Sequence, residues 1–221
     1  MPGTSTPTVA IVDYGLGNLF SVEQACRHAG IDAVISSDAQ QIRDAQAVIL
    51  PGVGAFASAM ARLNELELAD ELRTYAATNR PLIGICLGMQ LLMEESYEFG
   101  VHRGLGLVPG TVRRLRPNPE AGRFKVPQVG WNTLSVHPDP AVRSASLLKE
   151  FADGTFIYFV HSFCVEVGPG VTPLATSEYG GEKFCAAYSY GHITGIQGHP
   201  ERSGSDGLRF YENLAAILRD R

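Results

Sequence analysis

With 221 residues, 45% of them hydrophobic, the chain is long enough to bury a sizeable core, and we expect a single domain over residues 1–221. The formal net charge is −5 and no long basic run occurs, which argues against nucleic acid as the main partner. No apolar stretch is long enough to span a membrane, and residues 1–8 lack a signal-peptide pattern. We therefore expect a soluble protein without a membrane partner. Because the four cysteines form no C-x-x-C pair, we expect a reducing cytoplasm and no metal, and we expect no cofactor.

The first hundred residues alternate between strand and helix patterns. Asn18 is suited to cap a helix that Gly30 would end. The predicted strands cover residues 8–13, 33–35, 47–50 and 82–85, and the predicted helices cover residues 18–29, 38–45, 55–63, 66–77 and 89–95. Strands that alternate with helices form a parallel sheet with right-handed crossovers, so ligands should bind at the carboxyl ends of the strands.

After Gly100, short β-rich runs bounded by Pro and Gly replace the helical patterns, and we expect them to form hairpins that extend or flank the parallel sheet. The predicted strand runs are residues 107–115, 126–136, 155–166, 172–179, 184–190 and 193–198. We also expect a loop over residues 117–122, a brief helix over residues 144–151 and an amphipathic helix over residues 205–221. The fold class is therefore α/β, with a central, mostly parallel sheet and added antiparallel strands in the C-terminal half.

Cys86 lies where a buried strand gives way to a helical pattern. Gly84 and Gly88 flank it in a G-x-C-x-G arrangement, which is the spacing of the strand-turn-helix elbow that presents a nucleophile. A thiol at the start of a helix faces unpaired N–H groups, which favour the reactive thiolate. The alternative is an inert cysteine packed in the core, which is the commonest role of a free cysteine.

A cysteine nucleophile needs a base, and His199 in the sequence His199-Pro200-Glu201 is the candidate. Proline favours an extended conformation for the preceding residue, and in an extended chain residues i and i+2 point to the same side. The side chains of His199 and Glu201 should therefore converge. Without Cys86, His199 and Glu201 would be interpreted as an ordinary pair of surface residues.

Two motifs together resemble the class I, triad-type glutamine amidotransferases: G-I-C-L-G-M-Q around Cys86 and G-I-Q-G-H-P-E at residues 195–201. Four further blocks are similar to the glutaminase subunit of imidazole glycerol phosphate synthase. They are D-Y-G-L-G-N-L-F-S-V at residues 13–22, P-G-V-G-A-F at 51–56, V-P-Q-V-G-W-N at 126–132 and Y-F-V-H-S-F at 158–163. The resemblance covers almost the whole chain and implies the three-layer, flavodoxin-like fold of the class I amidotransferases.

The resemblance also implies the role of each motif residue. Cys86 would attack the side-chain amide of glutamine, His199 would shuttle the proton and Glu201 would orient His199. Gly52 and Val53 match the oxyanion strand, in which a backbone N–H must point at the tetrahedral oxygen. A tight turn between a strand and a helix is the alternative interpretation of these two residues, and both interpretations can hold together.

Four residues match the glutamine pocket of the family: Gln90 on the elbow helix, and His161, Ser162 and Phe163 in the Y-F-V-H-S-F block. A solvated glutamine on a helix surface would give the same pattern as Gln90. His161 has an alternative role as a buried, hydrogen-bonded strand residue.

Asn18, Trp131 and Asn132 correspond to positions that face the partner in this family. The partner implied by the resemblance is a (β/α)8-barrel cyclase, which would form a heterodimer with this chain and use its ammonia in histidine biosynthesis. The sole tryptophan has the alternative role of a core residue. The chain departs from the family pattern at Gln128, Cys164 and Gly198, where the family often has histidine, tyrosine and a large residue respectively; these departures affect the shape of the pocket and of the interface.

Three other functions remain open from the sequence. The nearest is an amidotransferase subunit that delivers ammonia to a different synthase. A dinucleotide- or phosphate-binding module built on Gly15-Leu16-Gly17 is weaker, because G-x-G-x-x-G requires a glycine where Phe20 stands. A catalytically silent relative would usually have lost the cysteine or the histidine, and both are present here.

Overall fold

The computed structural model describes residues 8–220. Most of the signal-peptide prediction, which concerns residues 1–8, and the last residue of the predicted C-terminal helix lie outside the described residues. The first half of the chain alternates strands and helices as predicted. The elements are β1 (Thr8–Val12), α1 (Leu19–His28), β2 (Asp32–Ser36), α2 (Ala39–Asp44), β3 (Ala47–Gly52), α3 (Phe56–Glu65), α4 (Leu68–Ala76), β4 (Leu82–Cys86) and α5 (Leu87–Leu91). Within residues 8–220, no helix has the length and apolar character that crossing a membrane requires.

Strands β2, β1, β3 and β4 lie side by side, followed by β14 (Ile193–Ile196). All four neighbouring pairs are parallel, and the order is that of a flavodoxin-like sheet. The two faces of β3 belong to separate buried clusters, with Ile49 on one side and Val48 and Leu50 on the other. Because both faces are covered, the strand is apolar throughout rather than alternating between apolar and polar residues.

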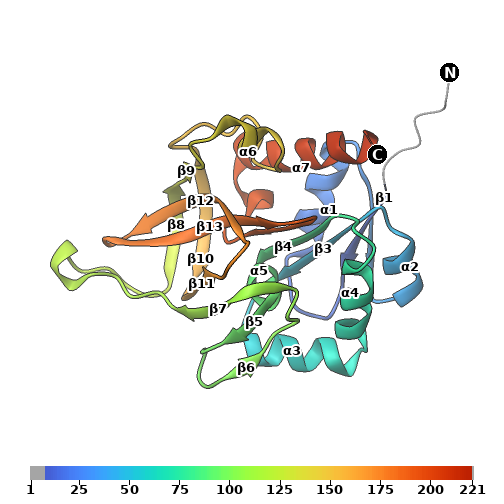
Figure 1. Ribbon diagram of the computed structural model, residues 1–221, viewed down its shortest axis with the longest axis horizontal. Helices are drawn as coiled ribbons and strands as arrows, with labels where there is room; N and C mark the ends of the chain where they lie inside the picture. The colour runs from blue at the N-terminus through green and yellow to red at the C-terminus, as the bar shows by residue number, and fades with distance from the viewer. Residues whose placement is uncertain (1–7, 221) are drawn as a thin grey trace.

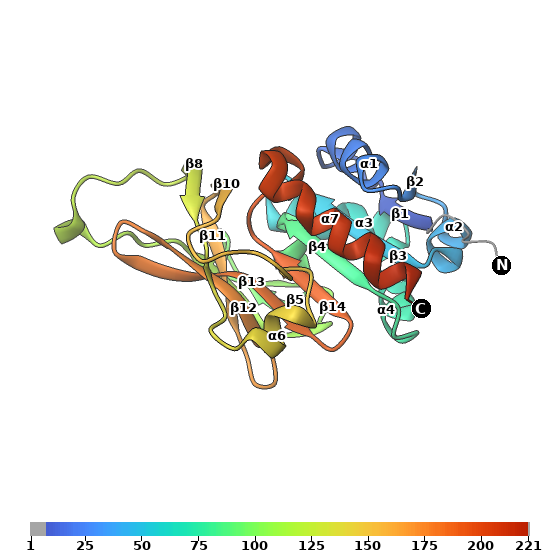
Figure 2. The same cartoon turned by 90° about the horizontal axis from the view of Figure 1, so that it is seen from above.

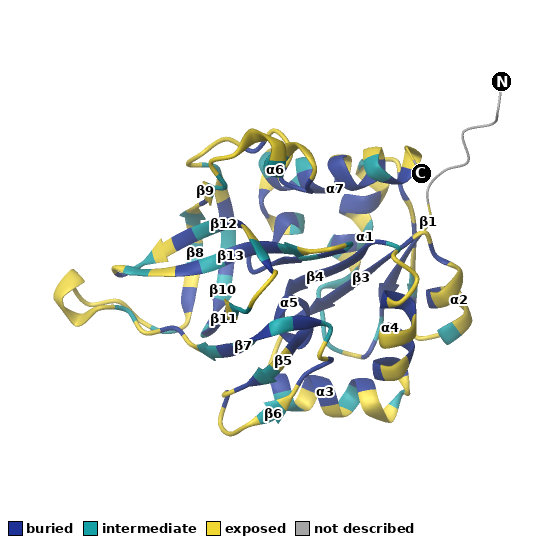
Figure 3. Ribbon diagram, viewed as in Figure 1, coloured by how far each residue is buried: buried dark blue, intermediate teal, exposed yellow. Residues whose placement is uncertain are grey.

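Helices cover both faces of this sheet (Figures 1 and 3). Helix α1 and the long C-terminal helix α7 (Gly204–Arg219) pack on the face of Ile49, and they lie side by side in the view from above (Figure 2). Helices α2, α3 and α4 pack on the opposite face. The result is the predicted three-layer architecture.

The second half of the chain continues the sheet with antiparallel strands, in the order β14, β13, β11, β7, β5 and β6; β7 and β5 alone pair in parallel in this part. The strands are β5 (Met93–Ser96), β6 (His102–Arg103), β7 (Val108–Arg114), β9 (Ser135–Val136), β11 (Phe163–Val167), β12 (Thr172–Tyr179) and β13 (Glu182–Tyr190). Strands β8 (Gln128–Thr133) and β10 (Phe156–His161) form a separate antiparallel ribbon. The predicted hairpins are thus present, and the run 155–166 is divided between two sheets at Ser162.

Two helix predictions are wrong in their extent. The helix expected over residues 89–95 ends at Leu91, because Met93 begins strand β5 and pairs with Val108 of β7. The brief helix expected over residues 144–151 lies earlier, as α6 (Pro140–Ser144), where Asp139 accepts a hydrogen bond from the N–H of Ala141. In the first case a non-local sheet pairing overrides the local helical pattern.

Two smaller expectations also need correction. Asn18 occupies the N-cap position of α1, but its side chain makes no capping hydrogen bond. The loop expected over residues 117–122 contains a short 3-10 turn, η1 (Pro119–Ala121), which the side chain of Asn118 caps. Gly30 ends α1 as predicted, with a positive φ of 74°.

Candidate active site

Cys86 occupies a strained turn between β4 and α5, as the elbow pattern predicts. Its φ of 54° and ψ of −110° are unusual for a residue with a side chain, and such strain costs about 1–3 kcal/mol. A Cβ atom at Gly84 would lie 2.7 Å from the backbone of Met89, and one at Gly88 would lie 1.7 Å from the carbonyl oxygen of Leu50. The flanking glycines are therefore required by the close approach of strand and helix.

His199 and Glu201 form a buried, hydrogen-bonded pair just after β14. The Nδ1 atom of His199 lies 2.8 Å from Oε1 of Glu201. The pair forms as predicted, but not in extended chain, because Pro200–Arg202 is a 3-10 turn, η2. Since a carboxylate can only accept, Nδ1 donates the proton and Nε2 of the neutral ring is left as the basic nitrogen.

The surroundings of His199 favour its protonated form. Burial lowers the pKa of His199, but hydrogen bonding and charge interactions with Cys86 and Glu201 outweigh burial and raise it to about 10. The Nε2 atom is buried and makes no well-formed hydrogen bond within residues 8–220. It is therefore the nitrogen available to exchange a proton with the neighbouring sulfur of Cys86.

Contacts with β10 fix the turn that carries this pair. The backbone N–H of His199 donates to the carbonyl oxygen of Tyr158, and the hydroxyl of Ser203 donates to the carbonyl oxygen of His199 at 2.6 Å. Gly198 is required here, because a Cβ atom would lie 2.2 Å from Cγ2 of Ile157. The absence of a large residue before the H-P-E motif follows from this close approach of β10.

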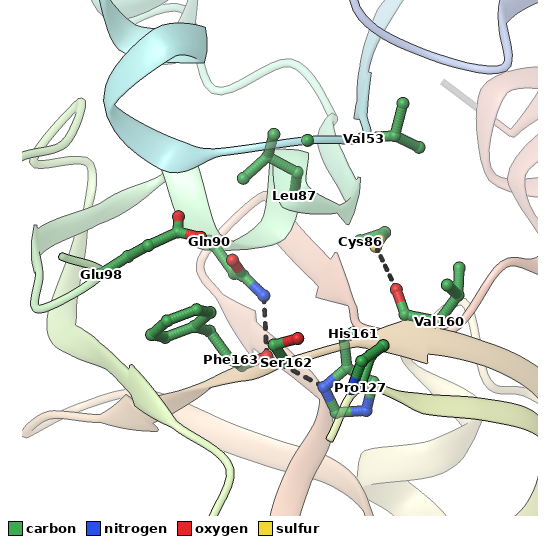
Figure 4. Close-up of a pocket in the computed structure, with 11 residues that line it drawn as sticks. Val53, Cys86, Leu87, Gln90, Glu98, Pro127, Val160, His161, Ser162 and Phe163 are labelled. Atoms are coloured by element: carbon green, nitrogen blue, oxygen red, sulfur yellow. Dashed lines mark hydrogen bonds between the residues drawn. The ribbon is translucent and has the colours of Figure 1, made fainter. Parts of the chain in front are cut away.

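A cavity of about 270 Å³ lies beside the elbow (Figure 4). It brings together residues from distant parts of the sequence. Six of the predicted site residues line it, namely Val53, Cys86, Gln90, His161, Ser162 and Phe163, together with Gly54, Leu87, Glu98, Pro127 and Val160. The carboxyl ends of β3 and β4 thus meet the β10–β11 connection, as expected for a ligand site in a parallel sheet.

Gln90 points into the molecule and not into solvent, so its interpretation as a solvated helix residue is wrong. Its Nε2 atom donates to the carbonyl oxygen of Phe163 at 2.9 Å and to Oε1 of Gln197 at 3.0 Å. Both acceptors are buried, which fixes the orientation of the Gln90 amide at the wall of the cavity.

His161 ends β10 and is buried between two polar partners. Its Nδ1 atom donates to the carbonyl oxygen of Phe163 at 2.9 Å, and its Nε2 atom lies 3.2 Å from the side-chain amide of Gln128. Burial lowers the pKa of His161 to about 4, and the nearby His199 contributes in the same direction. His161 is therefore neutral at neutral pH. It is a buried, hydrogen-bonded strand residue, as the alternative interpretation predicts, and it also lines the cavity.

Gly52 is the last residue of β3 and lies opposite Cys86 in the register of β3 and β4. A Cβ atom on Gly52 would lie 2.2 Å from the hydroxyl oxygen of Tyr14. That hydroxyl donates to the carbonyl oxygen of Pro51 at 2.9 Å, so it holds the end of β3 in place. The next residue, Val53, lines the cavity and is 41% exposed.

Three residues near the cavity were missed by sequence reasoning: Tyr14, Glu98 and Gln197. Glu98 is buried, lines the cavity, and accepts a hydrogen bond at 2.6 Å from the N–H of Phe56 at the start of α3. Its position depends on the β5–β6 loop, which no local pattern predicts. The motifs D-Y-G-L-G-N and G-I-Q-G-H-P-E contain Tyr14 and Gln197, so membership of a motif was the available signal for these two.

The three residues predicted to face a partner lie outside the cavity. Trp131 is 55% exposed, so its interpretation as a core residue is wrong. Its ring makes a T-shaped contact with the ring of Tyr158, and the neighbouring Asn132 donates to the carbonyl oxygen of Glu178. Asn18 is half-buried at the start of α1, and α1 and β8 lie along the same edge of the molecule in Figure 2.

The residues around the cavity are suited to acyl transfer by a thiol. Cys86 supplies a nucleophile, and the His199–Glu201 pair supplies an oriented base. No group of three or more His, Cys, Asp or Glu side chains that could hold a metal ion occurs within residues 8–220.

The comparisons with known proteins agree with this geometry. The sequence model of the family described as class-I glutamine amidotransferase matches residues 10–216. The imidazole glycerol phosphate synthase subunit HisH of Rhodopirellula baltica is 42% identical over 208 residues, which cover 94% of this chain and 96% of the relative. The subunit of the same name from Chloroflexus aurantiacus is 43% identical over 207 residues, or 93% of this chain and 94% of the relative.

Solved structures support the fold. A putative GMP synthase subunit from Thermoplasma acidophilum has a TM-score of 0.71 at 17% identity, and the match covers 98% of this chain and 96% of that protein. PurLQS from Thermotoga maritima has a TM-score of 0.72 at 20% identity, with coverage of 97% and 100%. The predicted fold class and family are thus confirmed: the chain belongs to the class I glutamine amidotransferases and, among them, to the HisH subunits of imidazole glycerol phosphate synthase.

Proposed function

We propose that this chain, acting as one glutaminase domain over residues 1–221, hydrolyses glutamine to glutamate and ammonia through Cys86, His199 and Glu201. The observation that carries the proposal is the position of Cys86, which lines the cavity while its sulfur interacts with the buried His199–Glu201 pair. Nucleophilic acyl transfer requires an accessible nucleophile, here presented by the strained elbow, and a hydrogen-bonded base in the same site.

The first half of the reaction releases ammonia. Cys86 gives its thiol proton to Nε2 of His199, and the resulting thiolate attacks the side-chain amide carbon of glutamine. A tetrahedral intermediate forms with the negative charge on its oxygen. Nε2 of His199, protonated at this stage, donates its proton to the amide nitrogen as the carbon–nitrogen bond breaks. Ammonia leaves, and a thioester joins Cys86 to the glutamyl group.

The second half releases glutamate. Nε2 of His199, now neutral, takes a proton from water, and the resulting hydroxide attacks the thioester carbon. The carbon–sulfur bond breaks and regenerates Cys86. Glu201 holds the ring through Nδ1 in both halves, so the same nitrogen faces the reacting atoms each time.

The end of β3 is the proposed oxyanion site. Gly52 lies opposite Cys86, and Val53 lines the cavity, so a backbone N–H of this segment is the proposed donor to the tetrahedral oxygen. One such donor changes turnover by about a hundred- to a thousandfold. The hydrogen bond from Tyr14 to Pro51 holds the strand end from which this segment continues.

The remaining cavity residues are the proposed substrate contacts. Gln90 and the backbone of His161, Ser162 and Phe163 form a polar wall beside Cys86. The carboxylate of Glu98 also lines the cavity, and it is suited to pair with the positively charged amino group of a free amino acid.

The proposed partner is the (β/α)8-barrel cyclase subunit of imidazole glycerol phosphate synthase, joined to this chain as a heterodimer in the cytoplasm. The names of the relatives support a partner subunit, because each relative is one subunit of that synthase. Free ammonia is mostly protonated at neutral pH and then lacks a nucleophilic lone pair. A direct passage between the two subunits would keep it reactive, and Asn18, Trp131 and Asn132 are the proposed contact residues.

The test is Cys86→Ala in the complex with its cyclase. Glutamine-dependent synthesis should fall to background, whereas synthesis from added ammonium salts should be unchanged, because only the source of ammonia is lost. Cys26→Ala is the matched control, since Cys26 is buried in α1 and does not line the cavity. Glutamine-dependent turnover that survives in Cys86→Ala would overturn the proposal.

A further inference from the structure

Gln197 lies between the proposed nucleophile and the glutamine pocket, although it contributes nothing to the mechanism above. It follows β14, whose Ile196 is paired with Ile85 of β4, so the parallel register places Gln197 beside Cys86. The side chain is completely buried, and its backbone N–H donates to the carbonyl oxygen of Ala186 at 2.8 Å. Burial of a whole polar side chain costs free energy unless each of its polar groups has a partner.

Both ends of the Gln197 amide have partners in the site. Nε2 donates to the sulfur of Cys86 at 3.8 Å, and Oε1 accepts from Nε2 of Gln90 at 3.0 Å. Gln90 in turn donates to the carbonyl oxygen of Phe163. Two side-chain amides therefore connect the wall of the pocket to the nucleophile.

The backbone of Phe163 determines which group donates and which accepts in each of these hydrogen bonds. A carbonyl oxygen can only accept, so Gln90 must turn its NH₂ group toward Phe163. The same NH₂ group also lies against Gln197, which must therefore present its oxygen to Gln90 and its own NH₂ group to sulfur. The orientation of the last donor is therefore set by hydrogen bonds within the protein.

We propose that Gln197 is a positioning residue that holds the sulfur of Cys86 and stabilises its thiolate by donating a hydrogen bond to it. This inference rests on the proposed role of Cys86 as the nucleophile. A donor aimed at sulfur stabilises the charged form more than the neutral thiol, because hydrogen bonds to charged groups are the stronger ones. The carbonyl oxygen of Val160, 3.8 Å from the same sulfur, is an acceptor for the neutral thiol.

The test measures the rate at which iodoacetamide alkylates Cys86 as a function of pH, with mass spectrometry of the peptide that contains Cys86. The other three cysteines are buried or half-buried, and burial raises their pKa to about 12, so they react slowly. In Gln197→Met, which fills a similar volume without a donor, the midpoint of the pH profile should rise by about one unit, and alkylation at a pH below both midpoints should slow about tenfold.

Two further variants separate positioning from packing. Gln197→Glu keeps the shape and an acceptor for Gln90 but places a carboxylate near sulfur, so its midpoint should rise further than that of Gln197→Met. Asn213→Leu is the matched control, because Asn213 is a buried amide on α7 that donates to the backbone carbonyl oxygens of Leu147 and Lys149. It should lower thermal stability and leave the pH profile unchanged.

A pH profile of Gln197→Met that superimposes on that of the unchanged protein, with the variant folded by circular dichroism, would overturn the proposal. A shift of equal size in Asn213→Leu would overturn it as well, since the effect would then be one of general stability. These outcomes are distinct from failure of the proposed function, which Cys86→Ala decides by glutamine-dependent turnover alone.

Discussion

The Nδ1 atom of His199 and the Oε1 atom of Glu201 are 2.8 Å apart, and only 4% and 1% of the two side chains are exposed. The carboxylate therefore both selects the ring tautomer and stabilises the charged imidazole. In Glu201→Gln the charge is lost and the amide can favour the wrong tautomer, whereas nucleophile and base remain. We expect turnover in the complex to fall by about a hundred- to ten-thousandfold.

The comparison that checks this prediction is steady-state glutamine hydrolysis by Glu201→Gln, His199→Ala and Cys86→Ala in the same complex. The last two should be the most damaged, and combining them should cost little more than either alone, because groups that act as a unit are not additive. Equal residual activity in all three variants would contradict the supporting role of Glu201, which is to orient His199 and stabilise its charge.

His161 should make the protein sensitive to acid. Its pKa is lowered from 6.5 to about 4 in the folded chain, so between these values the unfolded chain binds a proton that the folded chain does not. The contribution of His161 to the free energy of unfolding is fully present above pH 6.5. It is lost as the pH falls toward 4, by about 3 kcal/mol in total.

Urea unfolding at pH 7 and pH 4.5 measures this effect. The loss of unfolding free energy between the two conditions should be smaller in His161→Gln than in the unchanged chain. His28→Gln is the control, because His28 is exposed on α1. A variant at His161 that keeps the full acid sensitivity would show that other groups cause it.

The turn after β3 should control activity through its backbone. Gly54 has a φ of 106°, which disfavours any side chain, yet a Cβ atom there would meet no atom within 4 Å. Gly54→Ala is therefore a conformational probe of the proposed oxyanion segment without a steric clash. A substitution at Gly52 is less informative, because its Cβ atom would collide with Tyr14.

We expect the chain alone to be a poor glutaminase that the cyclase and its bound nucleotide activate, because Gly52 and Gly54 on either side of Val53 allow the peptide more than one orientation. Gly54→Ala should lower turnover about tenfold or more and change the ratio of activated to basal rates. Gly191→Ala is the control, with a φ of 57°, open space and a position outside the cavity. The idea fails if the free chain already runs at the rate of the liganded complex.

Trp131 should report on the partner. It is the sole tryptophan and is 55% exposed, so its fluorescence should shift when the cyclase covers β8. Trp131→Ala should weaken association and leave the stability of the free chain within about 0.5 kcal/mol. Tyr190→Ala, at an exposed position on β13, is the control for loss of an aromatic ring.

Titration of the cyclase into each variant, followed by urea unfolding of the free chains, checks the Trp131 prediction. Unchanged affinity in Trp131→Ala would remove β8 from the interface. A large loss of stability would instead assign the ring a packing role against Tyr158, which it contacts in the structure.

Much of the first half of the fold was predictable because its causes are local. The strand and helix patterns up to β4 depend on side chains a few residues apart, and the elbow at Cys86 depends on two glycines within two residues of it. The pairing of His199 with Glu201 is local as well. It was predicted for an extended chain, whereas in the structure His199 immediately precedes the 3-10 turn that contains Glu201.

The sequence by itself determined the alternating α/β core, the elbow cysteine and its histidine partner, since each is specified by residues close together in the chain. Only the tertiary structure decided that the elbow helix ends at Leu91, that Glu98 reaches the cavity, and that Gln197 lies against Cys86. These features depend on pairing between β5 and β7 and between β14 and β4, over separations that no local pattern encodes. The free energy of burying those strands together outweighs the helical preference of any single residue.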